Sequence, residues 1–410
     1  MSDVISARVD EALADIRRFA APLARPAERV ALLDAAGRTA AEDVRAGFDF
    51  PLFTNSAMDG FAIRTADFSC TGPMPVSIPW KHLITAGHPL KEEPKHGTAV
   101  RIMTGAPLPD GFDAVVPIEK TEPKEDTVTF AAGMVMPGTN VRAQGEVFRR
   151  GNVMIRRGDR LNASRLGLLA SLGYADVLCC PKPRAAVFSS GDELLEPSDG
   201  KLPPEGRIYN ANGVCVTAIA RELGFDASYL GILPDSEEAI EKAIADALSR
   251  FDAVICSGGV GPGDRDYTAA VVNRLGDMRH YHIGMRPGKP FSFGSAQGKL
   301  IVGLPGNPAA AATAARVFLP AVLESLLGVA AEKRPALTAI AAKDIKSRAG
   351  RRDFVRGTVS SDGQCRLVFT PDWQQSSASL ATAAKSNAVL EIPEETERLT
   401  AGSAAAVHLE

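Results

Sequence analysis

The sequence predicts a multidomain protein of the α/β plus β class. A chain of 410 residues is too long for one hydrophobic core. Strands and helices alternate between residues 185 and 327, and short β-like runs broken by proline and glycine occur on both sides of this region. Because alternating strands and helices require crossover connections, we expect a parallel sheet covered by helices.

Composition and charge exclude several classes of protein. Hydrophobic residues make up 45% of the chain and charged residues 23%, which is ordinary for a soluble globular enzyme. A net charge of −3 argues against nucleic acid or an anionic membrane as a partner. The N-terminal run MSDVISARVDEAL does not resemble a signal peptide, and no uninterrupted apolar run reaches the length of a membrane helix. Six cysteines without metal-finger spacing favour reduced thiols and a cytoplasmic location.

The N-terminal part of the chain predicts one helix and two segments that need each other. Apolar spacing predicts a helix over 6–20, which Pro22 ends. Short strands within 28–46 are too few to fold alone, and extended structure returns from 140 to 161. We expect these two segments to pair, with the proline-rich β region at 72–135 inserted between them.

From residue 162 onward the pattern becomes βαβ, followed by another β region. The nearly all-apolar run 252–256 is typical of a central strand that is covered on both faces. Further strands are expected at 185–189, 227–232, 279–284 and 300–302, with helices at 162–172, 212–223, from 236, through 272, and at 307–327.

Four domains are therefore expected. They are an extended connecting domain (23–46 and 148–178), an inserted β domain (47–147), an α/β domain (1–22 and 179–328) and a C-terminal β-barrel-like domain (329–410). Ligands of open α/β sheets bind at the carboxyl ends of the strands. Three polar or glycine-rich runs follow predicted strands, namely 189–193, 257–259 and 303–308.

The run from Val254 to Tyr267 is the most informative of these. Gly258 and Gly259 permit positive φ and expose backbone N–H groups, as phosphate-binding loops do. Asp264 and Asp266 follow, and two bare carboxylates about 4 Å apart repel by roughly 4 kcal/mol at an effective dielectric of 20. A bridging divalent cation would remove that repulsion. The alternative interpretation is a glycine-rich turn that caps the next helix.

Six motifs in this order resemble the MoeA-like family of molybdopterin molybdenumtransferases, which is related to gephyrin E domains. The resemblance covers about residues 5 to 395. The motifs are Asn55-Ser56-Ala57-Met58-Asp59-Gly60, Arg101-Ile102-Met103-Thr104-Gly105-Ala106, Ser189-Ser190-Gly191-Asp192-Glu193-Leu194, Ser257-Gly258-Gly259-Val260 with Asp266-Tyr267, Pro287-Gly288-Lys289-Pro290, and Gly303-Leu304-Pro305-Gly306-Asn307-Pro308.

The resemblance implies an elongated four-domain homodimer that takes adenylyl-molybdopterin and molybdate. Such a protein cleaves the pyrophosphate bond, inserts molybdenum into the dithiolene and releases AMP, assisted by a divalent cation that is usually Mg²⁺. The α/β domain is then the molybdopterin-binding domain, and its site includes residues from the inserted β domain of the neighbouring subunit. Other cofactor-biosynthesis proteins or a recipient molybdoenzyme are further partners that the resemblance implies.

The resemblance also assigns the site residues. The catalytic residues are Asp59, Glu193, Asp235 and Asp266, of which the last three would bind the metal. The substrate-binding residues are Thr104, Ser190, Gly191, Asn212, Ser257, Gly258, Gly259, Asp264, Arg286, Lys289, Pro305 and Asn307.

Several of these residues have a plainer interpretation from local sequence. Asp59 can simply form a turn, Glu193 can place charge at a helix N-terminus, and Asp235 and Asn212 can cap helices. As a ligand-binding residue, Asn212 would bond pterin or ribose. Arg286 and Lys289 suit phosphate or molybdate but also fit a solvated turn, and the neighbours Arg351 and Arg352 are further anion-site candidates.

The sequence departs from the family pattern near the expected chemistry. Val147 stands where a carboxylate is usual, Gly261-Pro262 replaces a hydroxyl residue, Arg286 replaces lysine, and Trp373–Ser377 replaces a glycine-serine motif. Two hypotheses follow: a working insertase, or a paralogue that binds molybdopterin or a partner protein as a carrier or scaffold. A molybdopterin adenylyltransferase is a third reading, although that activity does not need the flanking domains.

Overall fold

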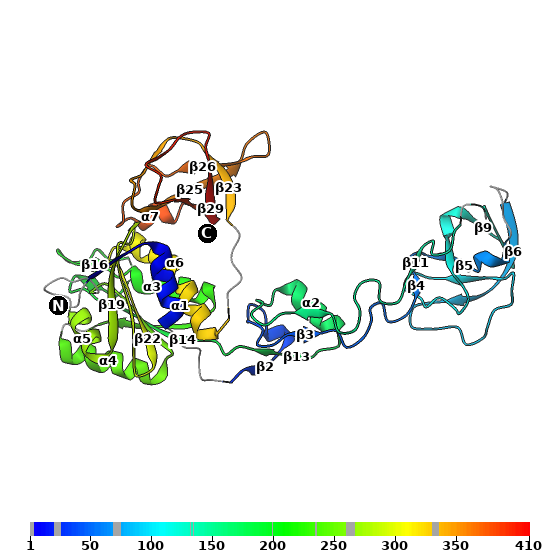
Figure 1. Ribbon diagram of the computed structural model, residues 1–410, viewed down its shortest axis with the longest axis horizontal. Helices are drawn as coiled ribbons and strands as arrows, with labels where there is room; N and C mark the ends of the chain where they lie inside the picture. The colour runs from blue at the N-terminus through cyan, green and yellow to red at the C-terminus, as the bar shows by residue number, and fades with distance from the viewer. Residues whose placement is uncertain are drawn as a thin grey trace. The chain divides into compact units, whose positions relative to one another are not determined.

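The protein has the multidomain α/β plus β architecture that the sequence predicts (Figure 1). The computed structural model describes residues 4–19, 26–68, 75–131, 133, 135–198, 200–233, 236–259, 267–329 and 336–410. Residue contacts divide the chain into two compact units. The first unit comprises 1–42, 157–167 and 175–410, and the second comprises 43–156 and 168–174. The four-domain boundaries expected from the sequence stay a prediction.

A seven-stranded sheet forms the centre of the first unit. Its order is β1 (Val4–Ala7), β19 (Asp277–Ile283), β21 (Pro290–Ala296), β22 (Lys299–Leu304), β18 (Ala253–Ser257), β14 (Arg184–Ser189) and β17 (Asp226–Ile232). The last four strands in this order are mutually parallel. β21 is antiparallel to both of its neighbours.

The expected parallel sheet is therefore mixed, and the reason lies in one tight turn. Gln297 and Gly298 join β21 to β22 with φ values of 52° and 72°. Two consecutive positive φ values suit a two-residue hairpin turn. The sequence interpretation assigned only 300–302 to a strand here and missed the hairpin, as it missed the edge strand β1 before the first helix.

Helices cover both faces of this sheet. On one face lie α1 (Val9–Phe19), α3 (Asn212–Leu223) and α6 (Pro308–Leu327), and on the other lie α4 (Glu237–Arg250) and α5 (Tyr267–Leu275). Along β18, Ile255 packs into the first face, whereas Val254 and Cys256 pack into the second. This double burial explains why β18 is an uninterrupted apolar run.

By length and composition alone, α6 would suit a membrane span. Its most apolar window has a mean hydropathy of 1.5, and 56% of that window is buried inside the protein. Phe318 and Leu319 of this helix are fully buried in the sheet core. The expectation that no membrane is a partner stays a prediction.

The first unit ends in a small closed barrel. Its sheet has the order β20 (Met285–Arg286), β25 (Arg352–Ser361), β26 (Leu367–Pro371), β23 (Leu337–Ala341), β29 (Ala404–Leu409) and β27 (Ala388–Ile392). A β25–β27 pairing closes the last five of these strands into a barrel, and β20 is added at β25. Short elements accompany it, namely β24 (Ile345–Lys346) paired with β28 (Arg398–Leu399), and α7 (Leu380–Ala383). Since β20 directly follows β19 of the central sheet, main-chain hydrogen bonds join the barrel to the α/β domain.

The remaining elements of the first unit are short. β15 (Leu194–Leu195) pairs with β16 (Ile208–Tyr209), and β2 (Glu28–Ala31), followed by the 3-10 helix η1 (Leu32–Asp34), pairs with β13 (Asp176–Cys179). The last pairing joins two segments that are far apart in the sequence. It explains why the short strands within 28–46 lacked a local partner.

The second unit is mainly β structure. Its six-stranded sheet has the order β8 (Ala114–Pro117), β5 (Gly60–Ile63), β7 (Ala99–Ile102), β6 (Pro75–Ile84), β10 (Thr127–Ala131) and β9 (Thr121–Pro123). Other elements are β3 (Val44–Arg45) paired with β12 (Val153–Ile155), β4 (Asn55–Ser56) paired with β11 (Val141–Arg142), and the 3-10 helices η2 (Thr65–Asp67) and η3 (Ile118–Lys120). The helix α2 (Ala163–Ser171) follows β12 in the chain and is divided between the units, with 163–167 in the first and 168–171 in the second.

Candidate functional site

The loops after three neighbouring strands meet at one rim of the central sheet. Ser189 and Ser257 end β14 and β18 and are register partners, and Leu304 ends β22 opposite Ser257. The Ser190 amide donates to the Ser257 carbonyl at 2.9 Å, and the Gly258 amide donates to the Leu304 carbonyl at 3.1 Å. The polar runs after β14 and β18 therefore lie at the same rim, as the sequence predicts.

Gly258 lets two of these loops touch. Its φ is +87°, and a Cβ on it would lie 2.3 Å from the Ser190 carbonyl oxygen. A Cβ on Gly259 would lie 2.9 Å from the hydroxyls of both Ser190 and Thr268. Loop packing thus requires small residues here, a reason that the sequence interpretation did not anticipate. The phosphate-binding role of these glycines stays a prediction.

Asn212 forms the centre of a buried polar network at this rim. Its Nδ2 donates to Ser257 Oγ at 2.8 Å and to the Gly306 carbonyl at 2.7 Å. Ser257 Oγ in turn donates to the Pro305 carbonyl at 3.0 Å. Because a carbonyl only accepts, the Gly306 contact fixes the orientation of the Asn212 amide.

The other amide atom of Asn212 has no hydrogen-bond partner. Its Oδ1 is buried and accepts nothing from the described residues, and the residue as a whole is 7% exposed. An unsatisfied buried acceptor is costly, so this atom is suited to receive an N–H or O–H group from a ligand. No side-chain hydrogen bond from Asn212 to its own helix is found among the described contacts, so its polar atoms serve the rim instead.

Glu193 places an exposed carboxylate beside the same rim. The carboxylate folds over Gly191, where a Cβ would lie 2.7 Å from Oε2. Strand β15 follows Glu193 directly, so the interpretation of Glu193 as charge at a helix N-terminus is wrong.

The structure does not test the expected metal site as a whole. Asp235, Asp264 and Asp266 lie outside the described residues. Among the residues that are described, no three His, Cys, Asp or Glu side chains are grouped to hold a metal. Ser236, the neighbour of Asp235, caps α4, because its Oγ accepts a hydrogen bond from the Ala239 amide at 3.3 Å.

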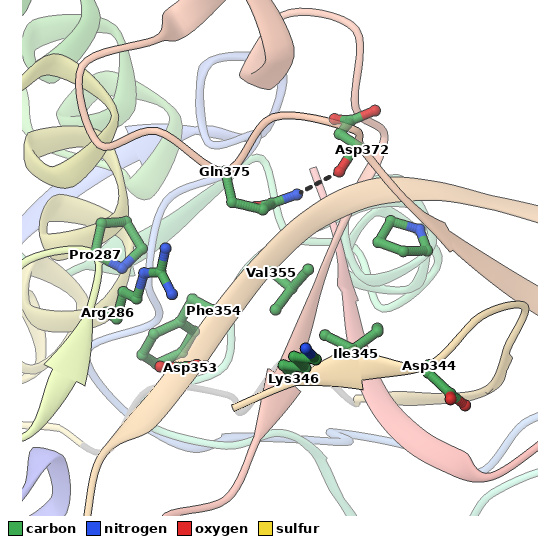
Figure 2. A pocket seen from close by; sticks show the side chains of 11 residues that line it. Arg286, Pro287, Asp344, Ile345, Lys346, Asp353, Phe354, Val355, Asp372 and Gln375 are labelled. Atoms are coloured by element: carbon green, nitrogen blue, oxygen red, sulfur yellow. Dashed lines mark hydrogen bonds between the residues drawn. The ribbon is translucent and has the colours of Figure 1, made fainter. Parts of the chain in front are cut away.

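A cavity of about 250 Å³ lies between the Arg286 loop and the C-terminal barrel (Figure 2). Arg286 and Lys346 bring positive charge to its lining. Three acids also line the cavity: Asp353 is paired with Arg351 at 2.8 Å, Asp344 accepts from the Ala401 amide at 2.8 Å, and Asp372 accepts from Ser386 Oγ. Lys289 is exposed in the same loop as Arg286 but does not line the cavity.

Arg356 lies on β25 next to the lining residue Val355, and the sequence analysis did not single it out. It is 3% exposed, and its Nη2 donates to the Ser376 carbonyl at 2.9 Å. Its Nε and Nη1 are buried with no partner in the described part of the chain. Burial lowers the pKa of Arg356, an effect that Asp372 and Glu410 oppose. Desolvated guanidinium donors of this kind are suited to an oxyanion.

The two arginines that the sequence did single out have partners. Arg351 pairs with Asp353, and Arg352 pairs with Asp10 at 2.7 Å and Glu394 at 3.0 Å. The sequence signal for Arg356 is its place in the run Asp353-Phe354-Val355-Arg356, where a cation continues a buried strand.

The sheet rim and Arg356 belong to one hydrogen-bonded region. The Ala309 amide at the start of α6 donates to the Ser377 carbonyl at 2.9 Å, and Asn307 Nδ2 donates to Ser377 Oγ at 3.3 Å. The carbonyl of Ser376, the residue before Ser377, accepts a hydrogen bond from the Arg356 guanidinium. The predicted site residues Pro305 and Asn307 therefore connect the sheet rim to the barrel.

Asp59 and Thr104 are brought together in the second unit. Asp59 Oδ1 accepts from the Thr104 amide at 2.7 Å and from Thr104 Oγ1 at 2.7 Å. These bonds lower the pKa of Asp59, so the exposed carboxylate is ionised at neutral pH. Val147, also in this unit, has an exposed fraction of 64%.

Comparisons with known proteins agree over the whole chain. Family models match the MoeA N-terminal region (domain I and II) at 7–173, a probable molybdopterin binding domain at 186–324 and the MoeA C-terminal region (domain IV) at 338–409. A molybdopterin molybdenumtransferase of Haemophilus influenzae is 37% identical over 93% of each chain. One from Bacillus subtilis is 33% identical over 89% of this chain and 86% of its own.

Solved structures give the same result. A molybdopterin biosynthesis MoeA protein from Pyrococcus horikoshii is 26% identical and superposes with a TM-score of 0.84, covering 99% of this chain and 100% of that one. The expected family is confirmed. The chain belongs to the MoeA family of molybdopterin molybdenumtransferases, which are enzymes of molybdenum cofactor biosynthesis.

Proposed function

We propose that this protein inserts molybdenum from molybdate into adenylyl-molybdopterin, cleaving the pyrophosphate bond and releasing AMP. The observation that carries the proposal is the hydrogen-bonded region that connects Asn212 to Arg356. At one end, Asn212 Oδ1 is a buried acceptor without a partner among the described residues. At the other end, Nε and Nη1 of Arg356 are buried donors without a partner there. A ligand with N–H donors next to a tetrahedral oxyanion would satisfy both ends.

Each part of the substrates has residues suited to it. Asn212 Oδ1 would accept from an N–H of the pterin. The loops at Ser190-Gly191 and Gly258-Gly259 would hold phosphate oxygens through the amides of Gly191 and Gly259, because the Ser190 and Gly258 amides already donate to carbonyls. Arg356 and Arg286 would bind molybdate, because guanidinium groups donate in a geometry that suits tetrahedral oxyanions. Lys289, exposed nearby, would add positive charge.

We assign the divalent cation, by expectation Mg²⁺, to Glu193, Asp235 and Asp266, with Asp264 beside the phosphates. Carboxylate oxygens are the donors that Mg²⁺ prefers, and Glu193 offers an exposed carboxylate at the rim. When bound, the cation supplies positive charge to phosphate oxygens. The residues of this chain bind and orient the substrates around it.

We also propose that Asp59 and Thr104 complete the site from the second copy of a cytoplasmic homodimer. Asp59 is an ionised, exposed carboxylate held rigidly by Thr104, which suits a base or an orienting group for water. Asp59 lies in a different unit from the rim, and the family resemblance implies that the neighbouring subunit supplies it.

The proposal is tested with pure protein, adenylyl-molybdopterin, Mg²⁺ and molybdate. We expect AMP release and molybdenum retention in equal amounts, both dependent on molybdate. Binding of the nucleotide without any AMP release would contradict it. Formation of adenylylated product from molybdopterin and ATP would instead indicate an adenylyltransferase.

Val147 favours a second candidate, a carrier that binds molybdopterin or a partner protein without turnover. An exposed apolar side chain stands where the family resemblance predicts a carboxylate, and valine neither binds metal nor transfers protons. The test is Val147→Asp, with Val147→Asn as the matched control for polarity. A gain of AMP release in the aspartate variant alone would support the carrier, whereas turnover by the unmodified protein would exclude it.

A further inference from the structure

The side chains of Glu196, Tyr229 and Asn210 form a series of hydrogen bonds that begins outside the candidate site and ends at the first turn of α3. Tyr229 of β17 lies at its centre. The Tyr229 hydroxyl donates to Glu196 Oε1 at 2.6 Å and accepts from Asn210 Nδ2 at 2.6 Å. Asn210 Oδ1 then accepts from the Gly213 amide in the first turn of α3 at 3.1 Å.

The direction of every bond in this chain is fixed. Burial and the Glu196 carboxylate raise the pKa of Tyr229, so its hydroxyl keeps its proton at neutral pH. That single proton is donated to Glu196, so the oxygen is left to accept from Asn210. The Asn210 amide is thereby oriented with Oδ1 toward Gly213. The Gly213 amide and the Tyr229 hydroxyl, whose proton is directed to Glu196, therefore favour the same orientation of the Asn210 amide.

Packing reinforces the same connection. A Cβ on Gly213 would lie 2.3 Å from Cε2 of Tyr229, so the ring rests directly on the first turn of α3. Ala211 precedes the helix and offers no capping side chain. Asn210 provides the side-chain acceptor for this turn instead, and its orientation depends on Tyr229.

Asn212 shares that first turn, and its Oδ1 is the buried acceptor at the sheet rim. We propose that Tyr229, with Glu196 and Asn210, is a positioning element that fixes the first turn of α3 and so holds Asn212 Oδ1 ready for a donor of the pterin. The assignment of the ligand rests on the proposed function. Neither Tyr229, Glu196 nor Asn210 is among the residues that the family resemblance assigned to the site.

The test uses three variants and a matched control in the full-length protein. Tyr229→Phe and Glu196→Ala break the chain, whereas Glu196→Gln keeps an acceptor for the hydroxyl. Tyr209→Phe is the control, because Tyr209 also donates a 2.6 Å bond, to the Lys201 carbonyl, and its hydroxyl makes no hydrogen bond to α3 among the described contacts. Measurements are the Kd for adenylyl-molybdopterin without molybdate and amide hydrogen exchange in the first turn of α3.

We expect Tyr229→Phe and Glu196→Ala to raise Kd about tenfold and to speed exchange at Gly213, as expected when one buried hydrogen bond is lost. Glu196→Gln and Tyr209→Phe should behave like the unmodified protein. Glu196→Ala leaves the Tyr229 ring in place, so it still tests the proposal if Tyr229→Phe folds poorly.

A double-mutant cycle separates positioning from general stability. Combined with Asn212→Ala, Tyr229→Phe should weaken binding no further than Asn212→Ala alone, because both act through one atom. Additive losses, or a Kd for Tyr229→Phe equal to that of Tyr209→Phe, would overturn the inference. Failure of the unmodified protein to bind adenylyl-molybdopterin would instead overturn the proposed function, and the inference with it.

Discussion

At the scale of single residues, Arg356 and Arg352 differ in whether their guanidinium nitrogens have partners. A buried cation with two unpaired nitrogens destabilises a fold, because nothing replaces the water that it loses. Under the proposed function, the bound oxyanion would take the place of that water. Arg352, four residues earlier, has three carboxylate partners and needs no ligand.

Arg356→Met should therefore separate activity from stability. We expect the KM for molybdate to rise at least tenfold, while the free energy of unfolding stays equal or increases by about 1 kcal/mol. Arg398→Met, which removes an exposed barrel cation paired with Asp344, should change neither quantity much. Steady-state kinetics and urea unfolding provide the measurements. A large loss of stability in Arg356→Met would show that the residue is structural.

The Asp59–Thr104 contact makes a prediction about ionisation. Thr104→Ala removes the hydroxyl bond, so the lowered pKa of Asp59 should rise toward its ordinary value of about 4, and Thr104→Ser should leave it low. Because the folded-state pKa is the lower one, the stability from this contact is present above the unfolded pKa. It is lost as pH falls through the folded pKa. Titration of the carboxyl carbon by NMR measures the shift, and equal values in all three proteins would refute it.

Sequence reasoning identified the rim residues but not their reasons for being there. Ser190, Gly258 and Asn307 were predicted to bind substrate, and the structure adds that they hold neighbouring loops together. Tyr229 and Glu196 carried no motif. Their roles depend on contacts between residues far apart in the chain, which spacing alone does not reveal.

At the scale of elements, the meeting of the rim loops depends on glycine at position 258. Gly258→Ala should destabilise the protein by about 2 to 4 kcal/mol, since it combines a positive φ with a Cβ 2.3 Å from a carbonyl. Gly298→Ala is the matched control, with φ +72° and open space around it, and should cost about 1 kcal/mol. Urea unfolding at neutral pH measures both. Equal losses would mean that the rim loops adjust without cost.

Elements with clear end signals were predicted well. The helix expected at 212–223 is α3 with the same bounds, and Gly224 ends it with φ 119°. The hairpin of β21 and β22 was missed, because Gln297-Gly298 is a weaker turn signal than Asn-Gly or Asp-Gly. Edge strand β1 has only four residues and pairs with a strand far along the chain, so no local pattern marks it.

At the scale of the whole molecule, Arg352 joins the barrel to the first helix. It pairs with Asp10 of α1 and with Glu391 and Glu394 of the barrel, and its side chain is 15% exposed. His408 bonds the other oxygen of Glu391 at 3.0 Å. These contacts hold elements together that lie hundreds of residues apart.

Arg352→Met should cost about 3 kcal/mol of stability at pH 7, because it removes the closest cation from Glu394, whose side chain is 7% exposed, and from the partly buried Glu391. Arg366→Met, at an exposed pair with Asp362, should cost less than about 0.5 kcal/mol.

His408, and next Arg352, lower the pKa of Glu391. Its contribution is therefore present above about pH 4 and lost as pH falls further. Urea unfolding at pH 7 and pH 3.5 would measure both effects, and an unchanged acid dependence in Glu391→Gln would contradict the assignment.

The overall fold class was predictable because each segment shows the hydrophobic periodicity of its own secondary structure. A barrel-like C-terminal domain was also expected, but the strand order of the mixed sheet was not, since it depends on which strands meet. The expected pairing of 28–46 with 140–161 was right in part: β3 pairs with β12, whereas β2 pairs with β13, which lies beyond the expected segment.

The pairing of β20 with β25 bears on how an oxyanion would be recognised. Arg286 is the register partner of Asp353, and Arg356 lies three positions further along the same strand. The separation of the two cations is thus set by backbone hydrogen bonding between adjacent strands. Under the proposed function, any movement that preserved this strand pairing would carry the backbones of Arg286 and Arg356 together, so an oxyanion site formed by the two residues would keep its backbone spacing.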